Sequence, residues 1–238
     1  LYQHTGDGRF RAAVHLGIES LMRYHGHVAG IFGGDEHLSG RNPSQGTELC
    51  AVVEYMFSLQ TLLRILGDVY LADILEKVAY NALPAALTSD IHAHQYDQQP
   101  NQVLVSAAER AWYNNGPEAN LFGLEPNFGC CTANMHQGWP KLVKNLWLAT
   151  PADGLAAAVY APCHVVATVG DGVQVRIVEE TAYPFSGTVR FTLHCPQPVA
   201  FPLQLRIPAW CEAAIVEVDG KAQLEAVGGR FVRLERTW

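Results

Sequence analysis

Two adjacent cysteines, Cys130 and Cys131, are the residues of this sequence best suited to chemistry. A thiolate is both a strong sulfur nucleophile and a ligand for soft metal ions. Neighbouring residues of a strand point to opposite faces, so both sulfurs can serve one site only if the backbone turns there, as Gly129 permits. Apolar residues at helical spacing follow the pair. They predict a helix whose positive end favours a thiolate and which Pro140 should kink.

A second pair of potential ligands, Glu48 and Cys50, stands at the head of another apolar run. Residues two apart face away from each other on a helix, so these side chains converge only if the helix begins after them. With the two adjacent cysteines they make four soft or borderline ligands, but the spacing matches no finger, ribbon or knuckle pattern. Two interpretations remain open: a zinc site of three cysteines and one glutamate, or small buried hydrophobic residues.

A loop rich in glycine, residues 30–43, carries the acidic pair Asp35 and Glu36. No Gly-Lys-Ser/Thr sequence follows it, and acidic side chains repel phosphate, so the loop does not indicate a phosphate site. An acid/base role for Glu36 and a solvated surface position are the two interpretations. His25 and His27 flank a glycine just before this loop. This pattern is more typical of loop histidines than of metal ligands.

The elements that must position these residues begin with helices. Apolar spacing predicts a core-facing helix over 9–24, a helix enclosed on nearly every face over 51–66, and an antiparallel partner over 68–83 that Pro84 ends. The stretch 88–128 has no periodicity, which predicts a long loop of the kind that is usually functional.

Amides and aromatic rings accumulate in that loop, and they are the groups that bind sugar hydroxyls and stack on sugar faces. The loop therefore predicts a carbohydrate cleft, with polar loop filling as the alternative. Three further acids of the loop, Glu109, Glu118 and Glu125, compete with Glu36 for the role of the acid. The predicted substrate-binding residues are Gln95, Tyr96, Trp112 and, after the two cysteines, His136.

After residue 150 the hydrophobic period changes to two, and short strands between Gly, Pro and Asp turns predict an antiparallel β-sandwich. The predicted strands cover 155–169, 173–178, 188–193, 203–207, 214–218 and 231–234. The sequence thus predicts a mainly α domain over 1–150 and an all-β domain, incomplete at its end, over 151–238.

The composition narrows the classes of partner. The 238 residues are 49% hydrophobic and carry a net charge of −7 with no basic run, which disfavours nucleic acid and anionic membranes. No apolar stretch is expected to span a bilayer. The six cysteines are expected to be reduced, which slightly favours a cytoplasmic protein. Because the chain begins at Leu1, we expect a fragment, so secretion stays open, and nothing in the sequence indicates the oligomeric state.

The helical hairpins, the amide-rich loop and the strands, together with Thr47-Glu48-Leu49-Cys50 and Gly129-Cys130-Cys131-Thr132-Ala133-Asn134, resemble glycoside hydrolase family 127, the β-L-arabinofuranosidase-like proteins. The resemblance spans nearly the whole chain. It implies the later half of an (α/α)6 barrel followed by the start of the β-domains. It also implies a retaining hydrolase of a small glycoside or oligosaccharide.

The resemblance implies zinc held by Glu48, Cys50, Cys130 and Cys131, with Cys130 as nucleophile and a loop acid, here Glu36, as acid/base. Two features depart from the family: Thr132-Ala133 replaces the common Pro-Pro, and Glu36 stands at a different distance from Glu48. These two departures affect the prediction of which sugar binds and which residue is the acid, but they do not affect the prediction of the metal ligands. The alternatives are a non-catalytic carbohydrate-binding or scaffold protein with a structural zinc site, and an inactive fragment of the enzyme.

Overall fold

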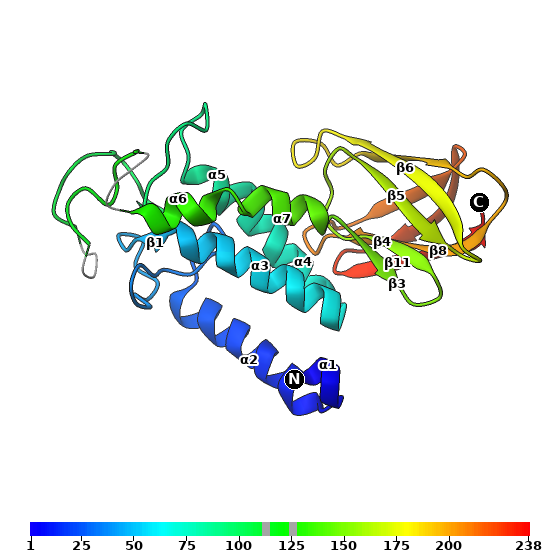
Figure 1. The fold of residues 1–238 in the computed structure, drawn as a ribbon, viewed down its shortest axis with the longest axis horizontal. Coiled ribbons are helices and arrows are strands. Elements are labelled where there is room, and N and C mark those ends of the chain that lie inside the picture. The colour runs from blue at the N-terminus through cyan, green and yellow to red at the C-terminus, as the bar shows by residue number, and fades with distance from the viewer. Residues whose placement is uncertain (111–114, 124–127) are drawn as a thin grey trace. The chain divides into compact units, whose positions relative to one another are not determined.

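The computed structural model describes residues 1–110, 115–123 and 128–238. Most helices belong to one part of the chain and most strands to another, as the colours of Figure 1 show. The prediction of helices followed by sheets is therefore confirmed.

The chain divides into two compact units. The first contains Leu1–Gly67 and Ile74–Leu142, and the second contains Asp68–Asp73 and Val143–Trp238.

The helical elements are α1 (Tyr2–Thr5), α2 (Gly8–His25), α3 (Leu49–Leu66), α4 (Val69–Lys77), the π-helical segment η1 (Val78–Ala82), α5 (Leu83–Ala85), α6 (Gly129–Met135) and α7 (Gly138–Lys144). The helix predicted over 9–24 is α2, which begins where the Asp7 side chain accepts a hydrogen bond from Arg9 N. Its apolar face was expected to reach the core, yet α2 contains no buried residue.

Helix α3 is the main core helix of the first unit. Its buried face includes Val52, Val53, Met56, Leu59 and Leu63. The opposite face, with Phe57, is exposed, so the expectation that α3 is enclosed on nearly every face is wrong.

By length and composition, α3 is also apolar enough to cross a membrane, against our expectation that no stretch is. It is the one such helix in the described parts of the chain, and 44% of its apolar window is buried within the structure. The core helix of a globular protein passes the same test, so this finding is weak evidence for a membrane span.

The helix predicted over 68–83 is interrupted, and it passes through Pro84 to Ala85. Proline has no N–H to donate to the preceding turn, and the turn before it widens into η1, in which Leu83 N–H donates to Val78 O. The Gln98 side chain donates to the Ala82 carbonyl at 2.7 Å.

Pro140 was expected to kink one helix after the cysteine pair, but the chain forms two helices, α6 and α7, separated by His136 and Gln137. Pro140 lies in the first turn of α7. Backbone N–H groups in a first turn have no partner within the helix, so the missing N–H of proline costs no hydrogen bond there. Gly138 begins α7 against α5, because a Cβ there would meet Leu83 Cδ2 at 2.8 Å.

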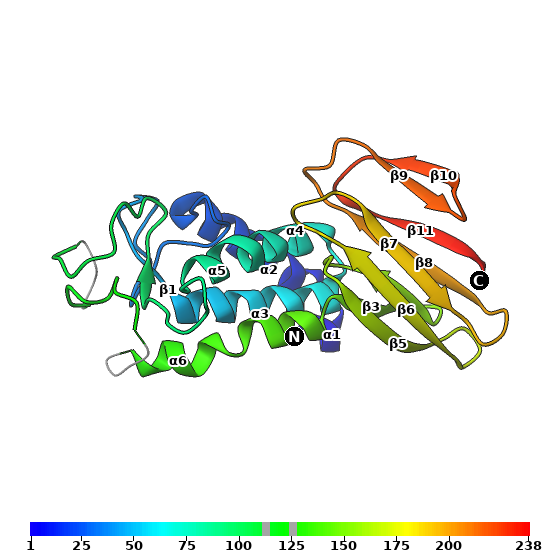
Figure 2. The ribbon, with the colours of Figure 1, turned by 90° about the horizontal axis from the view of Figure 1, so that it is seen from above.

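The strands of the second unit are β3 (Trp147–Thr150), β4 (Gly154–Ala157), β5 (Cys163–Val169), β6 (Val173–Thr181), β7 (Val189–His194), β8 (Ala200–Ile207), β9 (Ala214–Val218), β10 (Lys221–Ala226) and β11 (Arg230–Thr237). They form a sheet of order β11-β8-β4-β3, a sheet of order β5-β6-β7 and the hairpin β9-β10 (Figure 2). Pairing is antiparallel except between β4 and β8, which are parallel. The single strand predicted over 155–169 is wrong: it is β4 and β5, which belong to different sheets.

Side chains join the two larger sheets face to face. The rings of Trp147 on β3 and Phe191 on β7 meet edge to face, with centroids 5.6 Å apart. Trp147 Nε1 also donates at 2.8 Å to the buried carboxylate of Glu179 on β6. These contacts make the sheets a sandwich.

A buried arginine, Arg206 on β8, anchors residues 68–73 within the second unit. Its guanidinium donates to Asp73 Oδ1 and to Ala158 O, both at 2.5 Å. The Arg206 side chain is fully buried, and Tyr160 donates its hydroxyl hydrogen bond to the Arg206 carbonyl. Such a charge is tolerated in the interior because its donors are paired.

We expect Arg206→Met to lower the free energy of unfolding by about 3–5 kcal/mol, because it strips Asp73 of its buried partner. The matched control is Arg233→Met on β11, whose ion pair with Glu235 is exposed and should contribute less than about 1 kcal/mol. Urea denaturation followed by intrinsic fluorescence measures both. Equal losses of unfolding free energy in the two variants would contradict the conclusion that the buried Arg206 pair stabilises the fold more than the exposed Arg233 pair.

Candidate functional site

The first half of the site is the junction of a short strand with α3. Strand β1 (Thr47–Glu48) pairs with β2 (Asp97–Gln98), so the backbone of Glu48 is extended, with φ −66° and ψ 136°. The helix begins at Leu49, whose N–H donates to Tyr96 O at 3.0 Å. It therefore starts between the two predicted ligands and not after both, and Cys50 lies in its first turn.

The second half is the first turn of α6. Phe128 precedes the helix, and its carbonyl accepts from Cys131 N at 3.0 Å. The adjacent cysteines differ in environment: Cys131 is fully buried, whereas Cys130 is exposed. Gly129 is the first residue of α6, so the pair lies in the first turn of a helix, as predicted.

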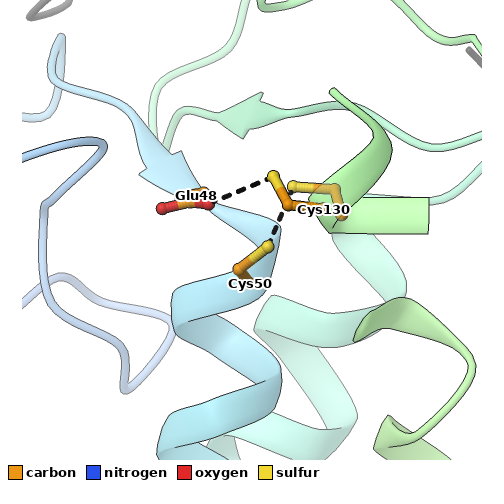
Figure 3. Close-up of side chains that lie close together, drawn as sticks. Glu48, Cys50 and Cys130 are labelled. Atoms are coloured by element: carbon orange, nitrogen blue, oxygen red, sulfur yellow. Dashed lines mark hydrogen bonds between the residues drawn. The ribbon is translucent and has the colours of Figure 1, made fainter. Parts of the chain in front are cut away.

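The two helix starts bring the four predicted metal ligands together (Figure 3). Cys50 Sγ lies 3.5 Å from Cys131 Sγ, and Cys130 Sγ lies 3.8 Å from Glu48 Oε1. All four ligand atoms are within 4.8 Å of one another. Three sulfurs and one carboxylate oxygen at such separations can hold one metal ion.

The electrostatics of the cluster favour a cation. Burial, followed by the neighbouring Cys50, raises the pKa of Glu48 to about 8. Hydrogen bonds, first from Cys131, lower the pKa of Cys50, while the same Cys50 contact raises the pKa of Cys131 and burial raises that of Cys130. Without a cation the four groups thus cannot all be anionic together.

The donor set fits zinc, which binds thiolate sulfur and carboxylate oxygen in sites of four ligands. A bound divalent ion favours the deprotonated form of every thiol that touches it. Asn134 on α6 donates to Cys50 Sγ at 3.2 Å and accepts from Gln137 Nε2 at 3.0 Å. This amide is an outer partner of the kind that orients metal ligands.

The predicted acid, Glu36, and the predicted nucleophile, Cys130, line one cavity of about 570 Å³. The Tyr96 hydroxyl donates to Glu36 Oε1 at 2.5 Å, and the Tyr96 ring packs on Phe128 with centroids 4.3 Å apart. Burial raises the pKa of Tyr96, so the hydroxyl remains a donor. Tyr96 thus fixes the position of the Glu36 carboxylate.

The two histidines before the acidic loop hold that loop in place. His25 Nδ1 accepts from Gly40 N at 2.9 Å, and His27 Nδ1 lies 3.4 Å from Thr47 Oγ1. The cluster of four candidate ligands does not include either of them, and His25 is the last residue of α2 and not a loop residue.

Asp35, beside Glu36, connects the acidic loop to the long loop. Its carboxylate accepts from His37 Nδ1 and from Asn115 Nδ2, both at 3.1 Å. Asn115 in turn lines the cavity. Sequence reasoning counted Asn115 among the loop amides but did not assign it to the site.

Asp97 is an acid that sequence reasoning missed. It lies opposite Glu48 in the β1–β2 pair and is fully buried, and neither carboxylate oxygen has a hydrogen-bond partner among the residues that the structure describes. Burial, followed by the charge of Asp35, raises its pKa to about 9. The register of two-residue strands carries too little sequence signal to find such a residue.

Two other predicted substrate-binding residues, Gln95 and His136, do not belong to the described lining of the cavity. Gln95 is fully buried and donates to Asn120 O at 2.7 Å, inside the long loop. His136 is exposed at the end of α6 and does not line the cavity. Trp112 and the competing acid Glu125 lie outside the described residues.

Thr132, one of the departures from the family pattern, makes a specific contact. Its hydroxyl lies 2.8 Å from Nε2 of the buried His94, whose Nδ1 lies 3.2 Å from Gln95 O. A carbonyl can only accept, so Nδ1 donates to Gln95 O, and Nε2 and the Thr132 hydroxyl form a second hydrogen bond. This bond ties the long loop to the turn that bears the two cysteines.

Comparison with family models gives two matches that together cover nearly the whole chain. Residues 1–144 match the catalytic domain of GH127 β-L-arabinofuranosidase, and residues 154–238 match the middle domain of the same family. No curated protein matches the chain.

Solved structures share the fold. The crystal structure of Ara127N-Se, a GH127 β-L-arabinofuranosidase from Geobacillus stearothermophilus T6, matches 100% of this chain with a TM-score of 0.83 and 23% identity. The GH127 β-arabinofuranosidase BT3674 matches 98% with a TM-score of 0.75 and 20% identity. In both cases the chain spans 38% of the length of the matched protein.

Proposed function

The chain belongs to glycoside hydrolase family 127, and from this premise we propose that it acts as a retaining glycoside hydrolase on β-L-arabinofuranosides. Cys130 is the proposed nucleophile and Glu36 the proposed acid/base. The observation that carries the proposal is that these two side chains line one cavity beside a cluster of metal-ligand type.

Glu48, Cys50, Cys130 and Cys131 are the proposed zinc ligands. Bound zinc supplies the positive charge that keeps the Cys130 thiol, whose pKa burial raises here, deprotonated at neutral pH. Asn134 and the contact between His94 and Thr132 hold the cysteine-bearing turn.

In the proposed reaction, Cys130 Sγ forms a bond to the anomeric carbon as the bond from that carbon to the leaving oxygen breaks. Glu36 donates its proton to that oxygen. Water then attacks the same carbon, Glu36 takes a proton from it, and Cys130 leaves as a thiolate. Two inversions retain the configuration.

We also propose that the helices α2 to α7 are part of an (α/α)6 barrel, as in the family. The half-buried apolar face of α2, with Phe10, Val14, Ile18 and Leu21, supports this, because a barrel helix packs against neighbours on more than one side.

A structural metal site in a carbohydrate-binding protein is the second candidate, because sites closed by four protein ligands are usually structural. The exposure of Cys130 favours the enzyme, since a purely structural ligand has no need to face a cavity. Iodoacetamide treatment of the metal-loaded protein separates the two. Modification of Cys130 alone, with loss of turnover, fits a nucleophile, and no modification fits a structural site.

We expect Glu36→Gln to lower kcat/KM on alkyl β-L-arabinofuranosides by about 10²–10⁴-fold, because the leaving oxygen then lacks its proton donor. The activated 4-nitrophenyl glycoside needs less protonation and should be slowed much less. The matched control, Glu109→Gln, alters an exposed acid of the long loop that does not line the cavity. Equal slowing of both substrates by Glu36→Gln would assign the acid to another residue.

A further inference from the structure

The cavity that Glu36 and Cys130 line has a second acidic residue in its described lining, the exposed Glu118. The described lining otherwise consists of Tyr96, Asn115, Gly116, Pro117 and Phe128, so this part of the wall contains two acids and no Lys, Arg or His. The proposed reaction gives Glu118 no role.

The position of Glu118 follows from the hydrogen bond between the two loops. Asn115 Nδ2 donates to Asp35 Oδ2 at 3.1 Å, and Asp35 is the chain neighbour of Glu36. The segment 115–118 is thereby fastened to the loop that carries the acid. In a retaining hydrolase the acid lies on the side of the departing group and the nucleophile on the opposite face of the sugar. Residues fastened to the acid therefore border the leaving group.

The field on this side of the cavity is negative. Glu36 and Glu118 line it, and Asp35 lies directly behind Asn115 with only 3% of its side chain exposed. Arg110 does not line the described part of the cavity, and its guanidinium donates to the Ser106 and Ala108 carbonyls of its own loop.

We propose that Glu118 selects the charge of the leaving group: the site takes glycosides whose aglycone is neutral or carries a protonated amine, and it disfavours aglycones that carry a carboxylate. The inference rests on the proposed function, since Glu36 defines the side of departure. Charges inside a partly closed cavity interact more strongly than in water, and an acid in the wall repels a carboxylate and attracts an ammonium group.

The test uses three 4-nitrophenyl β-L-arabinofuranosides with the purified, metal-loaded protein: the unsubstituted compound, a 3-carboxy analogue and a 2-aminomethyl analogue. The quantity measured is the ratio of kcat/KM on the amine to kcat/KM on the carboxylate. Comparing each variant with the wild type cancels the different reactivities of the phenols.

Glu118→Gln should lower this ratio at least fivefold, whereas the matched control Glu109→Gln should leave it within twofold. In the wild type the ratio should also fall as NaCl rises from 20 to 500 mM, because salt screens charges; this arm does not depend on the variant folding. A ratio that is unchanged in Glu118→Gln and insensitive to salt, with normal turnover of the unsubstituted compound, would overturn this inference and leave the proposed function standing. Absence of turnover on the unsubstituted compound would overturn the proposed function and the inference with it.

Discussion

Cys130→Ala is expected to abolish hydrolysis, with kcat lower by about 10⁴-fold or more, as when a nucleophile is removed from other covalent catalysts. Alanine leaves no atom that can bond to the anomeric carbon. Initial rates on 4-nitrophenyl β-L-arabinofuranoside measure the loss. Cys195→Ala, on a half-buried cysteine of the second unit outside the metal cluster, is the control and should keep full activity.

Loss of the metal could mimic this result, because Cys130 is also a proposed ligand. Zinc content is therefore measured on the same samples, and Cys130→Asp, which offers a carboxylate to the metal, is a second variant. Residual activity above one-tenth of the wild type in Cys130→Ala would exclude Cys130 as nucleophile.

Removal of the metal is expected to have the largest effect on stability. The four ligands join the start of α3 to the start of α6, and they form one site only in the folded protein. An ion at a free concentration of about 1,000 times its Kd stabilises the folded state by about 4 kcal/mol. For a chain of this size, chelation should then lower Tm by about 8–16 °C.

Differential scanning calorimetry with and without a zinc chelator measures the shift, and Cys131→Ser should lower the Tm of the untreated protein by a similar amount. Cys211→Ser, which changes a thiol of the second unit outside the cluster, should melt as the wild type does. A chelator that leaves Tm unchanged while removing all metal would show that the four side chains do not stabilise the fold through an ion.

Residue type and helix starts brought Cys130, Cys131, Glu48 and Cys50 together as candidate ligands, because all four stand at the heads of apolar runs. They left a zinc site and small buried residues both open, and it was the resemblance to the family that implied the ligand set. The structure places the helix start two residues earlier than predicted, since α3 begins at Leu49 and not at residue 51, and of the two ligands only Glu48 is extended.

The remainder of the site depends on contacts between loops, which hydrophobic period does not encode. Asp35 and Asn115 are 80 positions apart and meet through a hydrogen bond between their side chains. Asp97 reaches the cluster only through the register of two-residue strands. Gln95 was predicted to bind substrate from its type alone, and that type equally suits the interior of a loop, where it lies.

The errors in the fold have a similar origin. One continuous apolar run, 155–169, forms two strands because the chain changes sheets near Pro162, and periodicity does not record a change of sheet. Strand β10 (Lys221–Ala226) was missed because it is mostly exposed and two of its three apolar residues are alanines, so its alternation of polar and apolar residues is weak. The widening at η1 follows from Pro84, which sequence reasoning treated as a stop and not as a local distortion.

The ligands of the cluster come from the two ends of a long stretch of chain, with Cys50 and Cys131 81 positions apart. On the ribosome, Glu48 and Cys50 leave the exit tunnel well before their partners are synthesised. During that interval the apolar face of α3 has neither α6 nor the buried Leu142 of α7 to cover it. Nascent chains halted before residue 130 should therefore require chaperones and retain no metal, and those released after α7 should capture the ion as soon as the last thiol arrives.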